Sequence, residues 1–243
     1  MTGAWAAELL LGGIVLAASS VQRLAGIGFA LVAVPALVLL LGPSEGVALA
    51  NCGAGLVSAV GLADGWRDVR LRAMLPLVLA AGCCVPVGTW VARRLPEPQL
   101  LAGMGALMTT AVLVVMRGVR VASLRGTKGA LAAGAASGFM NSAAGVGGPA
   151  ISLYAVNAGW TVREFIPNAQ FYGLLVNALS LAANGAPRLS TAAWLLVAVA
   201  VAAGSVTGKA LAARIPEGPA RRLVLLLALA GALVTLGKGL WGW

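Results

Sequence analysis

Residues 141–149 read NSAAGVGGP, and this stretch decides how the rest of the chain is interpreted. It places an amide, a hydroxyl, three glycines and a proline between apolar segments. Pro149 suits the first turn of a helix that restarts there, because the N–H it lacks would have no intrahelical partner. In a bilayer, irregular backbone persists only where it is buried in protein or lines a cavity. The stretch therefore predicts a broken or re-entrant helix beside a binding site.

The composition around this stretch is that of a membrane protein. Of 243 residues, 60% are hydrophobic and 10% are charged, and the mean hydropathy is +0.95, whereas a soluble domain has about 25% charged residues. Aromatic residues make up only 5%. Small and aliphatic residues dominate instead, which lets membrane helices approach closely. We therefore expect an all-α integral membrane protein that crosses the plasma (inner) membrane several times, with the lipid bilayer as its environment.

The same composition excludes several other classes of protein. The net charge is +10, but the basic residues lie in short gaps between apolar runs. This pattern fits loops at an anionic membrane face and argues against nucleic acid as a partner. The chain has no His, and Cys52, Cys83 and Cys84 form no CxxC pair. Neither a metal site nor a thiol–imidazole nucleophile can be built from these residues, so we expect no cofactor and no enzymatic activity.

Polar and Gly/Pro breaks divide the chain into ten apolar stretches. A membrane-spanning helix needs about 20 residues, and most stretches are long enough. The junctions at 20–26 and 140–145 leave no room for a solvated loop. Each of the two pairs they join is a re-entrant hairpin, a spanning pair or a single broken helix. The stretches are 5–20, 26–41, 46–63, 73–92, 99–116, 127–140, 145–158, 166–184, 191–211 and 220–241.

The two junctions also mark an internal repeat. Residues 25–28 (AGIG) match 144–147 (AGVG) at an offset of 119, and 92–97 (ARRLPE) match 212–217 (AARIPE) at an offset of 120. We therefore predict a first membrane repeat over 1–123 and a second over 124–243. With five segments in each half, the second repeat is inverted relative to the first, a common plan of secondary transporters.

The distribution of Lys and Arg orients this arrangement. With every segment counted as a crossing, twelve basic residues lie on one side and four on the other, and such a bias marks the cytoplasmic side. Segment 117–128 is therefore expected in the cytoplasm and both termini outside. The larger set is Arg23, Arg67, Arg70, Arg72, Arg117, Arg120, Arg125, Lys128, Arg163, Arg214, Arg221 and Arg222, and the smaller is Arg93, Arg94, Arg188 and Lys238.

The first glycine turn, at Gly26 and Gly28, is one candidate for an anion site. A helix that restarts after such a turn presents free N–H groups and the positive end of its dipole. Gln22 precedes the turn, and Arg23 adds a planar charged donor. The alternative is that the glycines serve packing and that Arg23 reaches a membrane face.

The second glycine turn, at Gly145, Gly147 and Gly148, is the stronger candidate. It contains no Lys or Arg, so its backbone amides would supply the anion-binding donors, as in a nest. Asn141 and Ser142 add side-chain donors just before it. No Gly-Lys-Ser/Thr follows, so the turn is not a Walker loop.

Amides in later segments support these turns. Asn51 and Gln170 lie at matched positions of the two halves, and Asn168 lies beside Gln170. They are candidate donors to substrate oxygens, or alternatively interhelical hydrogen bonds worth ~1 kcal/mol. Asn177 and Asn184, nearer the end of the same helix, are secondary candidates. Asp64 is expected in a solvated loop, and no carboxylate is clearly deep in the membrane.

Residues 25–29 (AGIGF) leading into 34–37 (VPAL), together with 144–149 (AGVGGP), resemble the paired signature of the sulfite exporter TauE/SafE family. The resemblance implies a secondary transporter, an exporter, of a small sulfur-containing anion such as sulfite, sulfoacetate or thiosulfate. The anion would bind between the two turns near the membrane midplane and move by alternating access. Within the motifs, the implied site positions are Gly26, Gly28, Gly145, Gly147 and Gly148. A membrane-embedded enzyme or assembly component is the alternative, and a homodimer is left open.

Overall fold

The computed structural model describes residues 2–25, 28–118, 125–212, 214 and 217–242. Within these ranges it contains ten α-helices, one short 3-10 helix and no strand, which confirms the all-α prediction. The helices are α1 (Thr2–Ala25), α2 (Phe29–Leu41), α3 (Pro43–Gly65), η1 (Trp66–Asp68), α4 (Leu71–Arg94), α5 (Glu97–Met116), α6 (Gly126–Ala144), α7 (Gly148–Asn157), α8 (Val162–Asn184), α9 (Thr191–Ala212) and α10 (Glu217–Trp241).

Five of the described helical segments are long and apolar enough to cross a membrane. They are Ala7–Leu24, Pro43–Asp68, Leu71–Arg94, Glu97–Met116 and Thr191–Ala212, and α2 is a shorter apolar helix. Large apolar side chains also cover the outside of the bundle; Leu9 and Val206, for example, are each 70% exposed. Such a surface suits lipid, since water-soluble monomers rarely expose continuous apolar patches of this size. The chain is a membrane protein.

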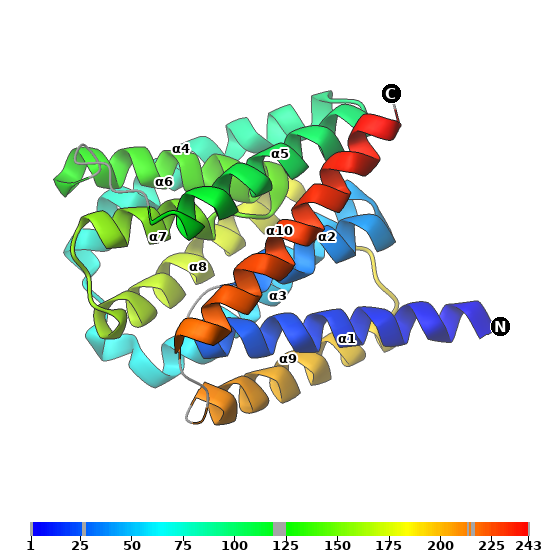
Figure 1. Ribbon diagram of the computed structural model, residues 1–243, viewed down its shortest axis with the longest axis horizontal. Helices are drawn as coiled ribbons and strands as arrows, with labels where there is room; N and C mark the ends of the chain where they lie inside the picture. Colours follow the sequence, from blue (N-terminus) through cyan, green and yellow to red (C-terminus); the bar gives the residue numbers. More distant parts are fainter. Residues whose placement is uncertain (1, 26–27, 119–124, 213, 215–216, 243) are drawn as a thin grey trace.

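The helices are arranged so that helix ends gather at two opposite ends of the bundle. Both termini lie at one end, and the segments 66–70 and 158–161 lie at the other (Figure 1). α2 and α7 are the short members of their hairpins, with 13 and 10 residues. Each runs back along the longer helix that precedes it, α1 or α6 (Figure 1).

The two halves of the chain are interleaved in space. α4 packs most extensively against α6, and α9 packs against α1, so the fourth helix of each half contacts the first helix of the other (Figure 1). α5 pairs with α10, and α3 pairs with α8. One hydrophobic cluster draws mainly on α1, α2, α3, α5, α9 and α10, and a second draws on α4, α6, α7 and α8.

The helix before the second glycine turn is longer than the sequence suggested. Residues 141–144 continue α6, so only 145–147 are non-helical there. Polar side chains can remain in this helix because their groups find partners close by. Ser142 Oγ donates to the carbonyl of Gly138, one turn earlier, at 3.0 Å, a back-bond that competes only weakly with the helix.

Left-handed glycines form the described parts of both turns. Gly28 precedes α2 with φ of 130°, and Gly145 ends α6 with φ of 70°. Only glycine adopts these angles readily, because it has no Cβ. Gly26 lies outside the described residues. Gly148 and Pro149 open α7, which confirms a proline in its first turn.

Candidate functional site

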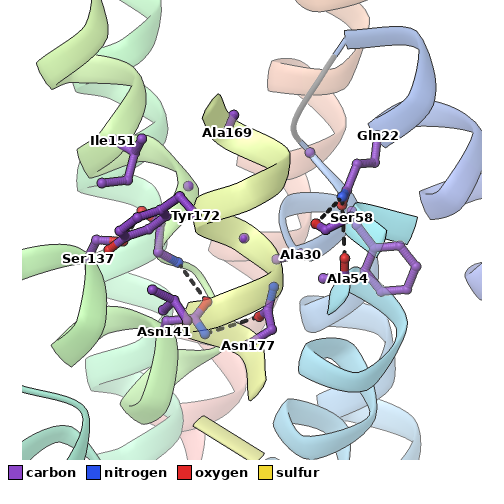
Figure 2. Close-up of a pocket in the computed structure, with 16 residues that line it drawn as sticks. Gln22, Ala30, Ala54, Ser58, Ser137, Asn141, Ile151, Ala169, Tyr172 and Asn177 are labelled. Carbon is purple, nitrogen blue, oxygen red and sulfur yellow. Dashed lines mark hydrogen bonds between the residues drawn. The ribbon is translucent and has the colours of Figure 1, made fainter. Parts of the chain in front are cut away.

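The two glycine turns meet at one cavity of about 70 Å³. A cavity needs roughly 10–15 Å³ to hold a single water, so this one accommodates several waters or a small anion. It lies where the two hydrophobic clusters meet, and Figure 2 shows its main side chains. The lining residues are Gln22, Gly28, Phe29, Ala30, Ala54, Ser58, Ser137, Asn141, Gly147, Gly148, Ile151, Ala169, Tyr172, Gly173, Val176 and Asn177.

Gln22 of α1 holds one side of the cavity. It is 6% exposed, and its Nε2 donates to Ser58 Oγ of α3 at 3.0 Å and to Gln170 Oε1 of α8 at 3.3 Å. A third acceptor is the Ala54 carbonyl at 3.4 Å (Figure 2). The amide therefore links three helices at the cavity wall.

Asn141 of α6 holds the opposite side. Its Nδ2 donates to Asn177 Oδ1 at 3.1 Å, to Ser180 Oγ at 2.9 Å and to Asn51 Oδ1 at 3.3 Å. Its Oδ1 accepts from the backbone N–H of Gly147 at 3.3 Å. Asn141 thus fixes the second glycine turn against α3 and α8 (Figure 2).

Ser137 and Tyr172 form a further polar group, on the α7 side of the cavity. Ser137 Oγ donates to the Gly147 carbonyl at 2.8 Å. Tyr172 of α8 lies next to Ser137 (Figure 2) and is only 4% exposed. Its hydroxyl interacts with the Ser137 side chain beside it but makes no hydrogen bond of acceptable geometry within the described chain. The first N–H groups of an α-helix lack intrahelical acceptors. Pro149 has no N–H and the Gly147 N–H is bonded to Asn141, so the N–H of Gly148 is the donor that this helix start offers to the cavity.

Arg23 does not line the cavity with Gln22. Its Nη2 contacts Asp64 Oδ2 at 2.6 Å, and Lys209 Nζ contacts the same oxygen at 3.0 Å. The Arg23 side chain is 9% exposed. Asp64 was expected in a loop, but it belongs to the last turn of α3 and pairs with two cations, from α1 and α9, which leaves the three groups with a net charge of +1.

Five further candidates are described but lie outside the cavity lining. Asn51 is fully buried and donates to the Asn141 carbonyl at 3.5 Å. Gln170 accepts from Gln22. Asn168 caps neighbouring backbone, accepting from the Arg70 N–H at 2.8 Å and donating to the Glu164 carbonyl at 2.6 Å. Asn51 and Gln170 therefore support the lining residues from behind.

Ser142 and Gly145 are the other two. Ser142 Oγ is bonded to carbonyls of its own helix, and a side chain at Gly145 would meet Val34 at 2.9 Å. Both contribute to packing around the turn. The structure thus brings Gln22, Gly28, Asn141, Gly147 and Gly148 to the cavity, and it places the remaining described candidates around them.

Sequence reasoning missed Ser58, Ser137 and Tyr172, and it ranked Asn177 low. A signal for two of them was present. Ser58 and Asn177 are 119 positions apart, the offset that relates the two glycine turns, so the repeat would have selected both. No comparable signal marks Tyr172, because its counterpart at position 53 is a glycine.

Comparison with protein families gives one match, to the family described as sulfite exporter TauE/SafE, over residues 10–235. Comparison with curated proteins and with solved structures gives no match. The matched range covers both glycine turns and every residue that lines the cavity. The chain is therefore a member of the sulfite exporter TauE/SafE family, whose members are membrane exporters of sulfite and related anions.

Proposed function

We propose that the protein exports a small sulfur-containing anion, such as sulfite, sulfoacetate or thiosulfate, which binds in the cavity between the two glycine turns. The observation that carries this proposal is that Gly28 of the first turn and Gly147 and Gly148 of the second line the same cavity. Gln22 and Asn141, which precede the turns, line it as well. Free amides at the start of α7 favour an anion through hydrogen bonds and the helix dipole.

We further propose that the cavity lies on the pseudo-two-fold axis of two inverted repeats, 1–123 and 124–243. Five pairs of its lining residues are related by the offset of 119, and the packing of α1 on α9 has its counterpart in the packing of α6 on α4. Both observations support a duplicated, inverted plan. The pairs are Gln22/Asn141, Gly28/Gly147, Phe29/Gly148, Ala54/Gly173 and Ser58/Asn177.

Alternating access would be a rocking of the two hydrophobic clusters against each other. The cavity touches Phe29 of the first cluster and Ile151, Tyr172 and Val176 of the second. Hydrogen bonds between amides join the clusters on either side of it, Gln22 to Gln170 and Asn141 to Asn51. Such bonds can be exchanged for water or substrate oxygens at low net cost, because each is worth about 1 kcal/mol.

For the orientation, we propose that the end of the bundle with segments 66–70 and 158–161 faces the cytoplasmic side of the plasma (inner) membrane. Arg67 and Arg70 lie in the first segment, and Arg163 follows the second. Arg23 ends α1 at the same end (Figure 1). The excess of basic residues there supports this orientation through the positive-inside rule.

The direct test is uptake of ³⁵S-labelled sulfite into vesicles that contain the purified protein, with and without a pH gradient. Gly148→Val is the test variant. A Cβ at Gly148 meets no atom within 4 Å, and the valine side chain would extend into the cavity that Gly148 lines. Gly13→Val is the control, since a Cβ there also meets nothing within 4 Å but lies on an exposed face of α1. We expect loss of uptake only for Gly148→Val. Equal uptake by both variants would place the substrate elsewhere.

A further inference from the structure

The walls of the cavity carry polar donors but no formal charge. Among the described residues that line it, none is Asp, Glu, Lys or Arg. Arg23, one position from Gln22, is bonded to Asp64 instead. A bound anion would therefore be stabilised by dipoles alone.

Dipoles without a counter-charge favour a singly charged anion. The cost of moving an ion from water into a low-dielectric site rises with the square of its charge, so a dianion costs about four times as much as a monoanion of equal size. The attraction to fixed donors rises only in proportion to the charge. A neutral site in a membrane therefore selects the monoanion.

The Tyr172 hydroxyl is a second observation that points to an anion in the cavity. Its hydroxyl is buried, has no hydrogen-bond partner of acceptable geometry within the described chain and points toward Ser137, which also lines the cavity (Figure 2). A buried hydroxyl without a partner costs about 1–3 kcal/mol in other proteins, so such a group is expected to have an acceptor in the working protein. An oxyanion in the cavity would provide it.

The repeat explains why this donor exists on only one side of the site. Tyr172 and Gly53 are 119 positions apart, as are Gly148 and Phe29. In the first half, the Phe29 ring packs against Gly53, where any Cβ would clash with it. In the second half the large and small residues are exchanged, so Gly148 leaves open space and Tyr172 brings a hydroxyl to the cavity. The two halves therefore differ at this place: the first has an apolar ring and the second has a hydroxyl donor.

We propose that Tyr172 binds the transported anion through its hydroxyl and that the site takes a monoanion, hydrogensulfite or a small sulfonate, in preference to a dianion. This inference rests on the proposed function and narrows its substrate class, because it disfavours thiosulfate and sulfoacetate, which are dianions at neutral pH. It assigns the sulfonate-type oxygens to the Tyr172 hydroxyl and to the N–H of Gly148 at the start of α7. Gln22 and Asn141 hold the surrounding walls.

The charge preference is tested by competition against uptake of ³⁵S-labelled sulfite in vesicles with the wild-type protein at neutral pH. Methanesulfonate is the monoanion competitor and sulfate is the dianion. We expect methanesulfonate to inhibit at a concentration at least about tenfold lower than sulfate. Equal inhibition would overturn the charge preference. Absence of any sulfite uptake by the wild type would instead contradict the proposed function.

The role of Tyr172 is tested with Tyr172→Phe, and Tyr154→Phe is the matched control. Tyr154 is the chain's other tyrosine; it is 6% exposed, packs edge-on against Trp160 and does not line the cavity. We expect Tyr172→Phe to raise the KM for sulfite about tenfold or more, as for loss of a hydrogen bond to a charged group. Its Tm without substrate should not fall, because no bond is lost. An unchanged KM, or a fall in that Tm, would overturn the assignment.

Discussion

Gln22 and Asn141, 119 positions apart, make equivalent hydrogen bonds on opposite sides of the cavity. Gln22 donates to Ser58 at 3.0 Å, and Asn141 donates to Asn177 at 3.1 Å. Ser58 and Asn177 are themselves 119 positions apart. Each amide therefore holds a partner at the matching position of its own half.

The second contact of each amide crosses to the other half. Gln22 donates to Gln170, and Asn141 donates to Asn51, both at 3.3 Å. Asn51 and Gln170 again differ by 119. The exchange of halves thus maps one set of contacts onto the other, as a two-fold axis between α3 and α8 would require.

Asn141→Leu is expected to lower both stability and transport. The substitution removes donors to Asn177, Ser180 and Asn51 and leaves buried polar atoms unpaired, which costs about 1–3 kcal/mol. Thermal denaturation in detergent measures the first effect, and vesicle uptake of labelled sulfite measures the second. A variant that transports normally would show that Asn141 only fills space.

Asn184→Leu separates the effect on stability from the effect on transport. Asn184 Nδ2 donates to the Ser142 carbonyl at 2.9 Å, away from the cavity lining. We expect a loss of about 1 kcal/mol in stability and no change in the KM for sulfite. A raised KM would mean that the site extends toward the end of α8.

Gly147→Ala and Gly148→Ala should differ in stability although the positions are adjacent. A Cβ at Gly147 would lie 2.7 Å from Ser137 Oγ and 2.8 Å from the Ser137 carbonyl, whereas a Cβ at Gly148 meets nothing within 4 Å. Overpacking of this kind typically costs 1–3 kcal/mol. We expect a lower Tm for Gly147→Ala alone, and weaker transport for both. Equal Tm values would contradict the packing described around the turn.

Thr161→Ala tests whether α8 needs its capping box. Thr161 Oγ1 accepts from the Glu164 N–H at 3.3 Å, and Glu164 Oε2 accepts from the Thr161 N–H at 3.0 Å. Loss of such a cap costs about 0.5–2 kcal/mol. The Tm should fall accordingly, while the KM for sulfite stays at the wild-type value because neither Thr161 nor Glu164 lines the cavity. A changed KM would imply that the start of α8 takes part in binding.

Much of the fold could be predicted because apolar length and Gly/Pro breaks are local properties. The stretch 191–211 became α9, Thr191–Ala212, and 99–116 became α5, Glu97–Met116. The end of α6 could not be predicted in this way. Asn141 and Ser142 resemble a break in the sequence, and only their tertiary partners on α3 and α8 show that they stay helical.

The candidate site likewise contains some residues that local sequence features identify and others that only tertiary contacts identify. The backbone requires a glycine at Gly28, where φ is 130°, and the close approach of Ser137 requires one at Gly147. Gly148 is marked in the sequence by its place beside them. Tyr172 carries no such mark, since its role depends on the space that Gly148 leaves across the cavity. Arg23 shows the converse: its charge suggested an anion site, but Asp64 of α3 lies within reach and pairs with it.

Transport should depend on the membrane potential. The described residues that line the cavity are uncharged. Transport therefore moves the full charge of the anion across the membrane, because no side-chain charge cancels it. One elementary charge gains about 2.3 kcal/mol per 100 mV, or roughly a 50-fold change in the equilibrium distribution of a monoanion. Vesicles loaded with labelled sulfite, with the potential set by a potassium gradient and valinomycin, measure this directly. We expect faster efflux when the interior is negative. Efflux that does not respond to the potential would mean that a co-transported or exchanged ion balances the charge, and that the uncharged lining does not carry the anion alone.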